Sequence, residues 1–413
     1  MNKLVIQFVA ILLLNLITLA QTGWLEQTSG TTANLNAVQF IDANNGFAVG
    51  DSGIILHTSN TGITWTTQMS GTDLPLRDVV FVSALQGWAV GSEIIIKTTN
   101  GGKNWNVCYT PSEYKWLNSI YFVDDTTGWA VGGYWIATLI LKTTDGGINW
   151  NQVSSVSGTL FSVYFINNNN GWATGEFCPE DCSGIFLRTT DGGITWNQHF
   201  CDAGGLLRSV YFINDTIGWV VGDSGITKTI DGGINWNSQP SANGWLWSVY
   251  FTNIDTGWAV GADGIIVHTS DGGENWVPQS SGTSEWLQSV YFIDNKNGWI
   301  VGEGGTILHT TNGGVIFIEE EIEEIPTDYH LSNNFPNPFN PSTKIRYSIP
   351  KTLKVLIRVF DILGKEIETL VNGEKSVGTY EITWYAKNAP SGIYFYRIQA
   401  GNFIETKKML LLK

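Results

Sequence analysis

The chain has 413 residues, of which 22 are Lys or Arg and 37 are Asp or Glu, so its formal net charge at pH 7 is −15. The acidic residues are concentrated before Pro326, whereas the remainder of the chain is basic. An acidic main region argues against nucleic acid and anionic lipid as binding partners.

The N-terminus has the pattern of a secretory signal peptide over residues 1–20. Lys3 precedes an apolar run from Leu4 to Leu19, and small residues stand at Thr18 and Ala20. This pattern predicts cleavage before Gln21. No later segment has enough consecutive apolar residues to cross a membrane. We therefore expect an exported mature protein, secreted or held at the outer-membrane surface.

Between Trp24 and Phe317 one pattern recurs at a period of 40 to 46 residues. Each copy has an apolar strand, a motif like Gly-Trp-Ala-Val-Gly and a motif like Thr-x-Asp-x-Gly-x-x-Trp. The last motif ends in turn at Trp65, Trp105, Trp150, Trp196, Trp236, Trp276 and Phe317. Four short runs of β-branched and aromatic residues in each copy predict a four-stranded antiparallel meander. Seven copies predict an all-β, seven-bladed β-propeller over residues 21–317.

The segment from Trp24 to Gln27 matches the fourth strand of later copies, yet it precedes the first copy. We expect it to complete the last blade, whose own fourth strand would begin at Phe317 and runs into acidic residues. Such a closure ties both ends of the propeller together.

The Thr-x-Asp motif predicts a specific turn between the third and fourth strands. The Thr and Asp side chains can accept backbone N–H groups, the Gly takes a positive φ, and the Trp buries its ring beneath the turn. This pattern resembles the Asp-box, also called the bacterial neuraminidase repeat. Together with Gly-Trp-Ala-Val-Gly, it is similar to the propellers of the photosystem II assembly and stability factor family.

The resemblance implies a scaffold that binds a partner protein rather than a catalyst. The family's propellers have an arginine-rich patch, whereas here only Arg77 and Arg208 stand at the matching start of the first strand. That departure argues against a photosynthetic role.

Three of the four cysteines, Cys178, Cys182 and Cys201, fall in the fourth blade. Disulfides are the default in an exported chain. The inserted loop with Cys178 and Cys182 and the end of the fourth strand at Cys201 lie at the same end of a meander. We expect one of the first two to bridge to Cys201. A metal site is disfavoured because no His joins the cluster at ligand spacing.

The tail begins with an acidic linker at residues 318–330 and continues as a small Ig-like β-sandwich at residues 331–413. Strands are expected at Lys344 to Ile349, Val355 to Asp361, Tyr380 to Tyr385, Ile393 to Gln399 and Lys407 to Leu412. The tail resembles the C-terminal sorting domain of the type IX secretion system, on the segments Phe335 to Pro338, Asp361 to Lys365, Ser391 to Tyr394 and Lys407 to Lys413. The resemblance implies recognition by the outer-membrane translocon. The alternative is an ordinary Ig-like adhesion module.

One face of the propeller should bear the connections between the second and third strands and between successive blades; we name it the acidic face. The first set of connections supplies the carboxylates Asp51, Glu93, Glu176, Asp223, Asp263 and Glu303. Aromatic residues come mainly from the second set, and they are Trp116, Tyr134, Trp135, Trp245, Trp247 and Trp286. Rings beside carboxylates suit a sugar or a cationic peptide. The alternative is that these rings only pack between blades.

Residues that break the repeat are the strongest candidates for a specific role, such as a cation site. These are Glu176, Glu180, Asp181 and Asp202. By contrast, every third strand has a basic or imidazole residue, which favours a structural partner of the turn or of its Trp. These residues are His57, Lys97, Lys142, Arg188, Lys228, His268 and His309.

The favoured interpretation is a non-catalytic binding scaffold for a glycan or a protein. Sialidase chemistry needs three arginines that clamp a carboxylate, and the repeats offer only Arg77, Arg188 and Arg208, of which Arg188 is the repeated basic residue. The alternative is a secreted glycoside hydrolase that uses two carboxylates of the acidic face. No motif indicates a nucleotide, haem or flavin cofactor.

Overall fold

This computed structural model describes residues 23–111, 115–135, 137–154, 156–178, 182–199, 205–239, 244–315, 326–387 and 389–413. The chain forms two compact units, Met1–Phe317 and Ile318–Lys413. The regular secondary structure of the described residues consists of β-strands and three short 3-10 turns. Within these ranges, none of the helices has the length and apolarity of a membrane span. The expected signal peptide lies outside the described residues.

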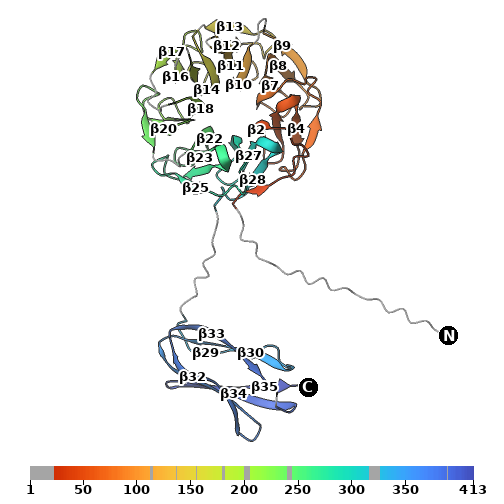
Figure 1. The fold of residues 1–413 in the computed structure, drawn as a ribbon, viewed down its shortest axis with the longest axis vertical. Helices are drawn as coiled ribbons and strands as arrows, with labels where there is room; N and C mark the ends of the chain where they lie inside the picture. Colours follow the sequence, from red (N-terminus) through yellow and green to blue (C-terminus); the bar gives the residue numbers. More distant parts are fainter. Residues whose placement is uncertain are drawn as a thin grey trace, which may run out of the picture. The chain divides into compact units, whose positions relative to one another are not determined.

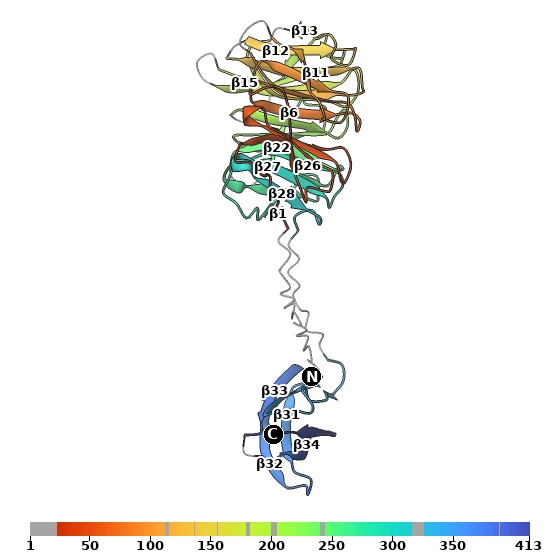
Figure 2. The ribbon, with the colours of Figure 1, turned by 90° about the vertical axis from the view of Figure 1, so that its right-hand side faces the viewer.

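The first unit is a seven-bladed β-propeller, which confirms the predicted fold (Figure 1). Each blade is a four-stranded antiparallel sheet, and blades 1 to 6 use the consecutive strands β2–β5, β6–β9, β10–β13, β14–β17, β18–β21 and β22–β25. Blade 7 is formed by β26, β27, β28 and β1. The first strand of each blade lies nearest the central axis (Figure 1), and Figure 2 shows the same blades from the side.

The strand bounds repeat closely from blade to blade. The innermost strands are β2 (Leu35–Phe40), β6 (Leu76–Phe81), β10 (Trp116–Phe122), β14 (Thr159–Phe165), β18 (Leu207–Phe212), β22 (Leu246–Phe251) and β26 (Leu287–Phe292). The second strands are β3 (Gly46–Gly50), β7 (Gly87–Gly91), β11 (Gly128–Tyr134), β15 (Gly171–Phe177), β19 (Gly218–Gly222), β23 (Gly257–Gly261) and β27 (Gly298–Gly302).

The third strands are β4 (Ile55–Thr58), β8 (Ile94–Thr98), β12 (Ala137–Thr143), β16 (Ser183–Thr189), β20 (Gly225–Thr229), β24 (Ile266–Thr269) and β28 (Ile307–Thr310). The outer strands are β5 (Thr66–Gln68), β9 (Asn106–Tyr109), β13 (Asn151–Ser154), β17 (Asn197–His199), β21 (Asn237–Gln239), β25 (Val277–Gln279) and β1 (Leu25–Glu26). Three connections between second and third strands contain the 3-10 turns η1 (Asp51–Gly53), η2 (Ala262–Gly264) and η3 (Glu303–Gly305).

The N-terminal strand closes the ring as the sequence predicts. In β1, Leu25 pairs with His309 and Glu26 with Leu308 of β28. Trp24 is only 3% exposed, meets the ring of Phe292 edge-on at 5.7 Å, and donates its indole N–H to Gln279 Oε1 of blade 6 at 2.8 Å. Trp24 therefore occupies in blade 7 the place that a turn tryptophan occupies in the other blades.

The tryptophan of each Gly-Trp motif stacks on a phenylalanine of the next blade. Trp88 of β7 lies nearly parallel to Phe122 of β10, with 3.7 Å between ring centroids and 11° between planes. The equivalent pairs, 3.5 to 4.1 Å apart, are Phe47–Phe81, Trp129–Phe165, Trp172–Phe212, Trp219–Phe251, Trp258–Phe292 and Trp299–Phe40. The apolar core of the propeller thus lies between blades rather than within them.

Two further contacts fix each of these phenylalanines. In blade 3, the turn residue Trp150 meets Phe122 edge-on at 5.9 Å. Gly128 lies directly against that ring, where an added Cβ would be 2.6 Å from Phe122. The Gly of the Gly-Trp motif is therefore required by close packing, because any side chain there would collide with the phenylalanine.

The lysines of the third strands also join neighbouring blades. Lys97 Nζ lies 5.2 Å from the centroid of Trp88 and donates to the carbonyl of Gly146 at 2.7 Å, and Trp88 Nε1 donates to the same carbonyl at 3.2 Å. Gly146 belongs to the turn of the following blade. His309 instead stacks on Trp299, with ring centroids 4.7 Å apart. These contacts are structural, as expected for this position, but Lys97 contacts the turn of the next blade rather than that of its own.

The turn between third and fourth strands has the predicted hydrogen bonds. Thr143 Oγ1 accepts the N–H of Gly147 at 2.9 Å, and Asp145 Oδ1 accepts the N–H of Asn149 at 2.9 Å. Gly147 has a φ of +80°, and Trp150 is 9% exposed. The backbone N–H of Asn149 stabilises the ionised carboxylate and lowers the pKa of Asp145 to about 2.

The second unit is a two-sheet β-sandwich. One sheet has the order β29 (His330–Leu331), β30 (Ser342–Ile349), β33 (Gly378–Tyr385). The other has the order β32 (Glu366–Lys375), β31 (Leu353–Phe360), β34 (Gly392–Ala400), β35 (Phe403–Leu411). Trp384, Tyr347, Tyr396 and Met409 fill the core between the sheets. The five strands expected from the sequence are present, and β29 and β32 are additional.

We expect Trp24→Ala to destabilise the propeller by about 3–5 kcal/mol, because it deletes a buried ring and leaves Gln279 Oε1 without its indole donor. Urea unfolding of the purified protein measures the effect. Leu25→Ala is the control, since Leu25 is the next residue in the chain and is 57% exposed. Equal stability of the two variants would contradict the closure by Trp24.

Candidate functional site

Each innermost strand has a β-bulge at its acidic-face end. In blade 5 the register shifts between Leu207 and Ser209, so Arg208 is the extra residue. The residues at this position form a ring, one from each blade, that we name the bulge ring. Its members are Asn36, Arg77, Asn118, Phe161, Arg208, Trp247 and Gln288. Bulges are enriched beside functional sites because they redirect a side chain without ending the strand.

The connections between blades divide the acidic face into a regular and an irregular part. Those that lead into blades 1, 2 and 7 share the sequence Ser-Gly-Thr, in which the Ser hydroxyl donates to the Thr carbonyl at 3.0 to 3.1 Å. The connections into blades 3, 5 and 6 lack this sequence, and in blade 4 the sequence Ser157-Gly158-Thr159 leads directly into β14, which begins at Thr159. In blades 3 and 4 the second and third strands also extend further, to Tyr134 and Phe177. The irregular part is where the repeat leaves room for a specific site.

A pocket of about 400 Å³ lies on the irregular part, between blades 3 and 4. Its described lining residues are Trp116, Tyr134, Trp135, Thr159, Phe161, Glu176 and Cys178. Trp116 meets Tyr134 edge-on, with ring centroids 5.6 Å apart. Thr159 lies opposite Glu176 in the β14–β15 pair, so the carboxylate is held on a strand rather than on a loop. We name this cavity the aromatic pocket.

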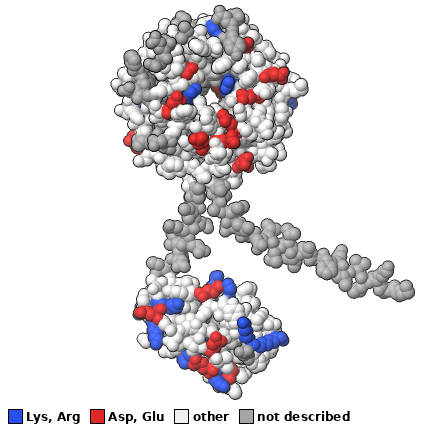
Figure 3. Space-filling model, in the orientation of Figure 1, with Lys and Arg blue, Asp and Glu red and all other residues white. Residues whose placement is uncertain are grey.

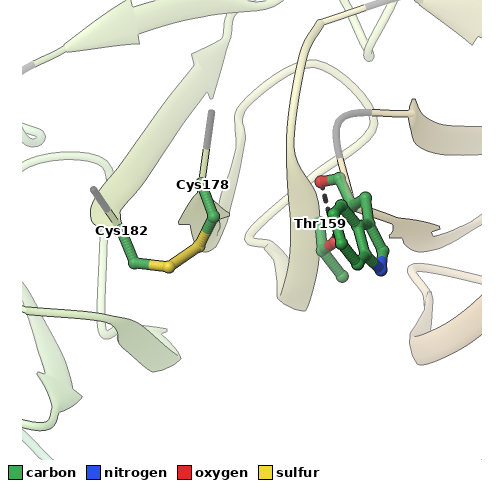
Figure 4. Close-up of a disulfide and its surroundings, with 4 residues drawn as sticks. Thr159, Cys178 and Cys182 are labelled. Carbon is green, nitrogen blue, oxygen red and sulfur yellow. Dashed lines mark hydrogen bonds between the residues drawn. A yellow bond between two sulfur atoms is a disulfide. The ribbon is translucent and has the colours of Figure 1, made fainter. Parts of the chain in front are cut away.

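Trp135 projects its ring at the rim of the aromatic pocket. It is 67% exposed and has a φ of +59°, in the left-handed region that non-glycine residues rarely adopt. Thr159 Oγ1 donates to the Trp135 carbonyl at 3.2 Å and so supports this conformation (Figure 4). Strained backbone and an exposed large ring at one residue are typical of a functional position.

Next to the aromatic pocket, Arg208 lies against two aromatic rings. Its guanidinium carbon is 4.6 Å from the centroid of Phe161 and 4.5 Å from that of Trp247. Arg208 Nε also donates to Asp223 Oδ1 at 3.5 Å. Phe161 therefore belongs both to the aromatic pocket and to the environment of Arg208.

The remaining predicted tryptophans form a second cluster in blades 6 and 7. Trp247 stacks on Trp286 at 5.7 Å between centroids, and Trp245 meets Trp286 edge-on at 6.3 Å. Trp245 is 51% exposed. Packing between blades thus accounts for the contact of Trp247 with Trp286, whereas Trp245 and Trp135 present their rings to solvent.

The six predicted carboxylates are not gathered in one place. Glu176 lines the aromatic pocket and Asp223 pairs with Arg208. Asp51 accepts the side-chain amides of Asn34 and Asn36 at 3.1 and 3.2 Å. Glu93 and Asp263 stand in their own connections, whereas Glu303 is near enough to Asp51 for their charges to interact.

The electrostatics of Glu176 and Glu303 differ from those of ordinary surface acids. Burial raises the pKa of Glu176, while Arg208 acts in the opposite direction and Asp223 adds to the increase. Burial likewise raises the pKa of Glu303, with further contributions from Glu285 and Asp51. Figure 3 shows several acidic and fewer basic groups around the centre of the propeller face.

The structure corrects the predicted disulfide. Cys178 bonds to Cys182, with 4.1 Å between their Cα atoms, so neither pairs with Cys201 (Figure 4). Cys178 directly follows β15 and Cys182 directly precedes β16. Because Phe177 of β15 lies opposite Ser183 of β16, the strand pairing brings the two cysteines together at the tip of the hairpin. Cys201 lies outside the described residues, as do Glu180, Asp181 and Asp202. The described residues contain no group of three His, Cys, Asp or Glu side chains suited to a metal ion.

Sequence reasoning missed Phe161, the stacking of Arg208 and the role of Asp78. Aligning the seven repeats would have marked the positions of Phe161 and Arg208, since the bulge position varies in chemistry although it always follows a Leu. Its residues in blades 1 and 3 are structural, because Asn36 and Asn118 donate to the carbonyls of Leu76 and Leu160 in the next blade.

Asp78 completes a ring of hydrogen bonds around the axial channel. In five blades a strand serine accepts a backbone N–H of the following blade, as Ser119 Oγ does from Val163 at 3.3 Å. Blade 1 has Ala37 at this place, and Asp78 of blade 2 accepts both the N–H of Val79 at 2.8 Å and that of Ile120 at 2.9 Å. The Asp78 carboxylate thus accepts two backbone N–H groups, each of which a serine hydroxyl accepts in the other blades.

Two family models match this chain. One, described as Photosynthesis system II assembly factor YCF48, matches residues 17–110, 64–159, 201–277 and 240–327, together more than half of the chain. The other, described as Secretion system C-terminal sorting domain, matches residues 333–412. The protein is therefore an exported propeller that the type IX secretion machinery delivers to the cell surface or the extracellular space. It belongs to the YCF48 assembly factor family.

Solved structures support the same fold. YCF48 from Cyanidioschyzon merolae is 21% identical with a TM-score of 0.59, and the match covers 70% of this chain and 98% of that one. A structure titled YCF48 bound to D1 peptide is 20% identical with a TM-score of 0.57, covering 70% and 97%. PorZ, a type IX secretion component of Porphyromonas gingivalis, is 11% identical with a TM-score of 0.51, covering 90% and 58%. A search of the curated proteins finds no match.

The pKa of Asp78 leads to a prediction about the pH dependence of stability. Burial beside the channel raises the pKa of Asp78 to about 6 from its ordinary value of 3.8. The folded state binds the carboxyl proton of Asp78 more tightly than the unfolded state does. The contribution of Asp78 to the free energy of unfolding is therefore most favourable below pH 4. It is lost as the pH rises through 6, by at most about 3 kcal/mol.

We expect Asp78→Asn to remove this part of the pH dependence. Urea unfolding at pH 4 and pH 7 gives the difference between wild type and variant, which cancels the other titrating groups. Asp255→Asn is the control because Asp255 is exposed. Parallel pH profiles of the wild type and Asp78→Asn would contradict the assignment.

Proposed function

We propose that this protein is a non-catalytic binding scaffold that takes a glycan or polypeptide ligand on its acidic face. The observation that carries the proposal is the aromatic pocket, which lies where the connections depart from the repeat. An apolar pocket with a few converging polar groups is the usual form of a ligand site. The exposed rings of Trp135 and Trp245 extend the same surface.

The alternative, a glycoside hydrolase, finds less support. Two-carboxylate catalysis needs both acids on opposite sides of one scissile bond, about 5–10 Å apart. The described lining of the aromatic pocket has one carboxylate, Glu176. Asp223 is engaged by Arg208 and Asp51 by two asparagine side chains, so these acids serve local structure.

The tail supplies delivery rather than binding. Residues 333–412 match the sorting domain, and their sandwich has its own core. We propose that the translocon is the partner of this unit and that the propeller meets its ligand outside the cell. No cofactor is needed for either step.

Deletion of residues 333–413 should abolish surface delivery and leave the propeller folded inside the cell envelope. Fractionation followed by protease protection of intact cells measures this outcome. The full-length chain is the control in the same cells. Surface exposure of the truncated chain would contradict the role of the tail.

Trp135→Ala should weaken ligand binding at least about tenfold with little loss of stability, because this ring is exposed and contacts solvent in the free protein. Retention of the purified full-length protein on glycan and peptide arrays, with a parallel assay for glycan cleavage, measures both binding and turnover. Ile194→Ala is the matched control, being 66% exposed in the turn at the opposite end of blade 4. Cleavage of any bound glycan would overturn the non-catalytic assignment, and unchanged binding by Trp135→Ala would overturn the site.

A further inference from the structure

The chemistry of the aromatic pocket distinguishes between the two ligand classes. Four of its described lining residues are aromatic, Cys178 is in a disulfide, and Glu176 is the one charged residue. The other hydrogen-bonding groups are the hydroxyls of Thr159 and Tyr134 and the indole N–H groups of Trp116 and Trp135. The Thr159 hydroxyl already donates to the Trp135 carbonyl. A sugar presents several hydroxyl groups that each require a partner when they are buried. In the described part of the pocket, the side-chain acceptors for such hydroxyl groups are the Glu176 carboxylate and the hydroxyls of Thr159 and Tyr134.

A cation on an aliphatic stem needs fewer partners. Its stem packs on apolar surface, its charge lies over the faces of aromatic rings, and one carboxylate balances it. Trp116, Tyr134, Trp135 and Phe161 supply the rings, and Glu176 supplies the carboxylate. Trp is the strongest of these rings for a cation.

The neighbouring site shows this arrangement within the protein itself. Arg208 lies 4.6 Å from the centroid of Phe161 and 4.5 Å from that of Trp247, with the Asp223 carboxylate at 3.5 Å. The aromatic pocket, between blades 3 and 4, likewise combines aromatic rings with one carboxylate. No Lys or Arg is among its described lining residues.

The local charges also favour a cation. Glu176, Arg208 and Asp223 interact electrostatically, and together they have two negative charges and one positive charge. One negative charge in this group is therefore not balanced by Arg208. A ligand cation beside Glu176 would balance it at short range, where the surrounding rings reduce screening by solvent.

We propose that the aromatic pocket binds the arginine or lysine side chain of a polypeptide ligand, with Glu176 as the charge partner. A pocket of about 400 Å³ suits one long side chain. Phe161 continues the surface toward Arg208, Trp247 and the exposed Trp245, which a peptide backbone can follow. This inference rests on the proposed function, from which it selects a polypeptide rather than a glycan.

The test uses the purified full-length protein and short peptides with acetylated and amidated ends, immobilised in matched pairs. In each pair arginine is replaced by citrulline, its uncharged isostere, or lysine by acetyl-lysine. We expect at least about tenfold greater retention on the charged member. Glu176→Gln and Trp135→Ala should each lose this discrimination. Glu274→Gln and Ile194→Ala should keep it, because both residues are exposed in turns at the opposite end of their blades.

The outcomes separate this inference from the proposed function. Retention on glycans but not on peptides would overturn the inference and leave the binding function in place. Equal retention on arginine and citrulline peptides would overturn the role of the cation. Discrimination that survives both Glu176→Gln and Trp135→Ala would place the cation elsewhere. Retention on neither array would overturn the inference and the binding function together. Thermal unfolding of each variant confirms that it is folded before binding is compared.

Discussion

The structure depends on one contact that is repeated around the ring, in which an aromatic residue of one blade stacks on a phenylalanine of the next. That phenylalanine is held on its other sides by a glycine and by the edge of a turn tryptophan. Since each blade completes the core of its neighbour, no blade has a full core alone. The ring must therefore close, and Trp24 supplies in blade 7 the indole that the last repeat lacks.

The sequence predicts this framework well because the residues of the contact stand at fixed spacings within each repeat. Gly128 and Trp129 are adjacent in the chain, and their roles follow from the motif alone. The site is different, since Phe161, Arg208 and Trp247 come from three blades. Their proximity depends on how blades follow one another around the axis, which the spacing of residues along the chain does not encode.

The other differences have similar physical causes. The predicted bridge to Cys201 assumed that residues at one end of a blade would pair, whereas the paired strands below Cys178 and Cys182 bring these two together directly. Strand β32 escaped prediction because it is an edge strand with mostly exposed, charged or polar residues and lacks apolar alternation. Tertiary pairing with β31, rather than its own pattern, makes it a strand.

Confining the core to the spaces between blades leaves the acidic face free to vary. The connections into blades 3 to 6 can change in length and composition without touching any stacked pair. The features that break local rules lie there: Trp135 with its positive φ and exposed ring, and Glu176 with a raised pKa. The stability of the propeller explains neither residue. A small residue would be easier to accommodate in place of Trp135, and a neutral residue in place of Glu176. Such exceptions in an otherwise consistent repeat are what a binding surface on a rigid scaffold requires.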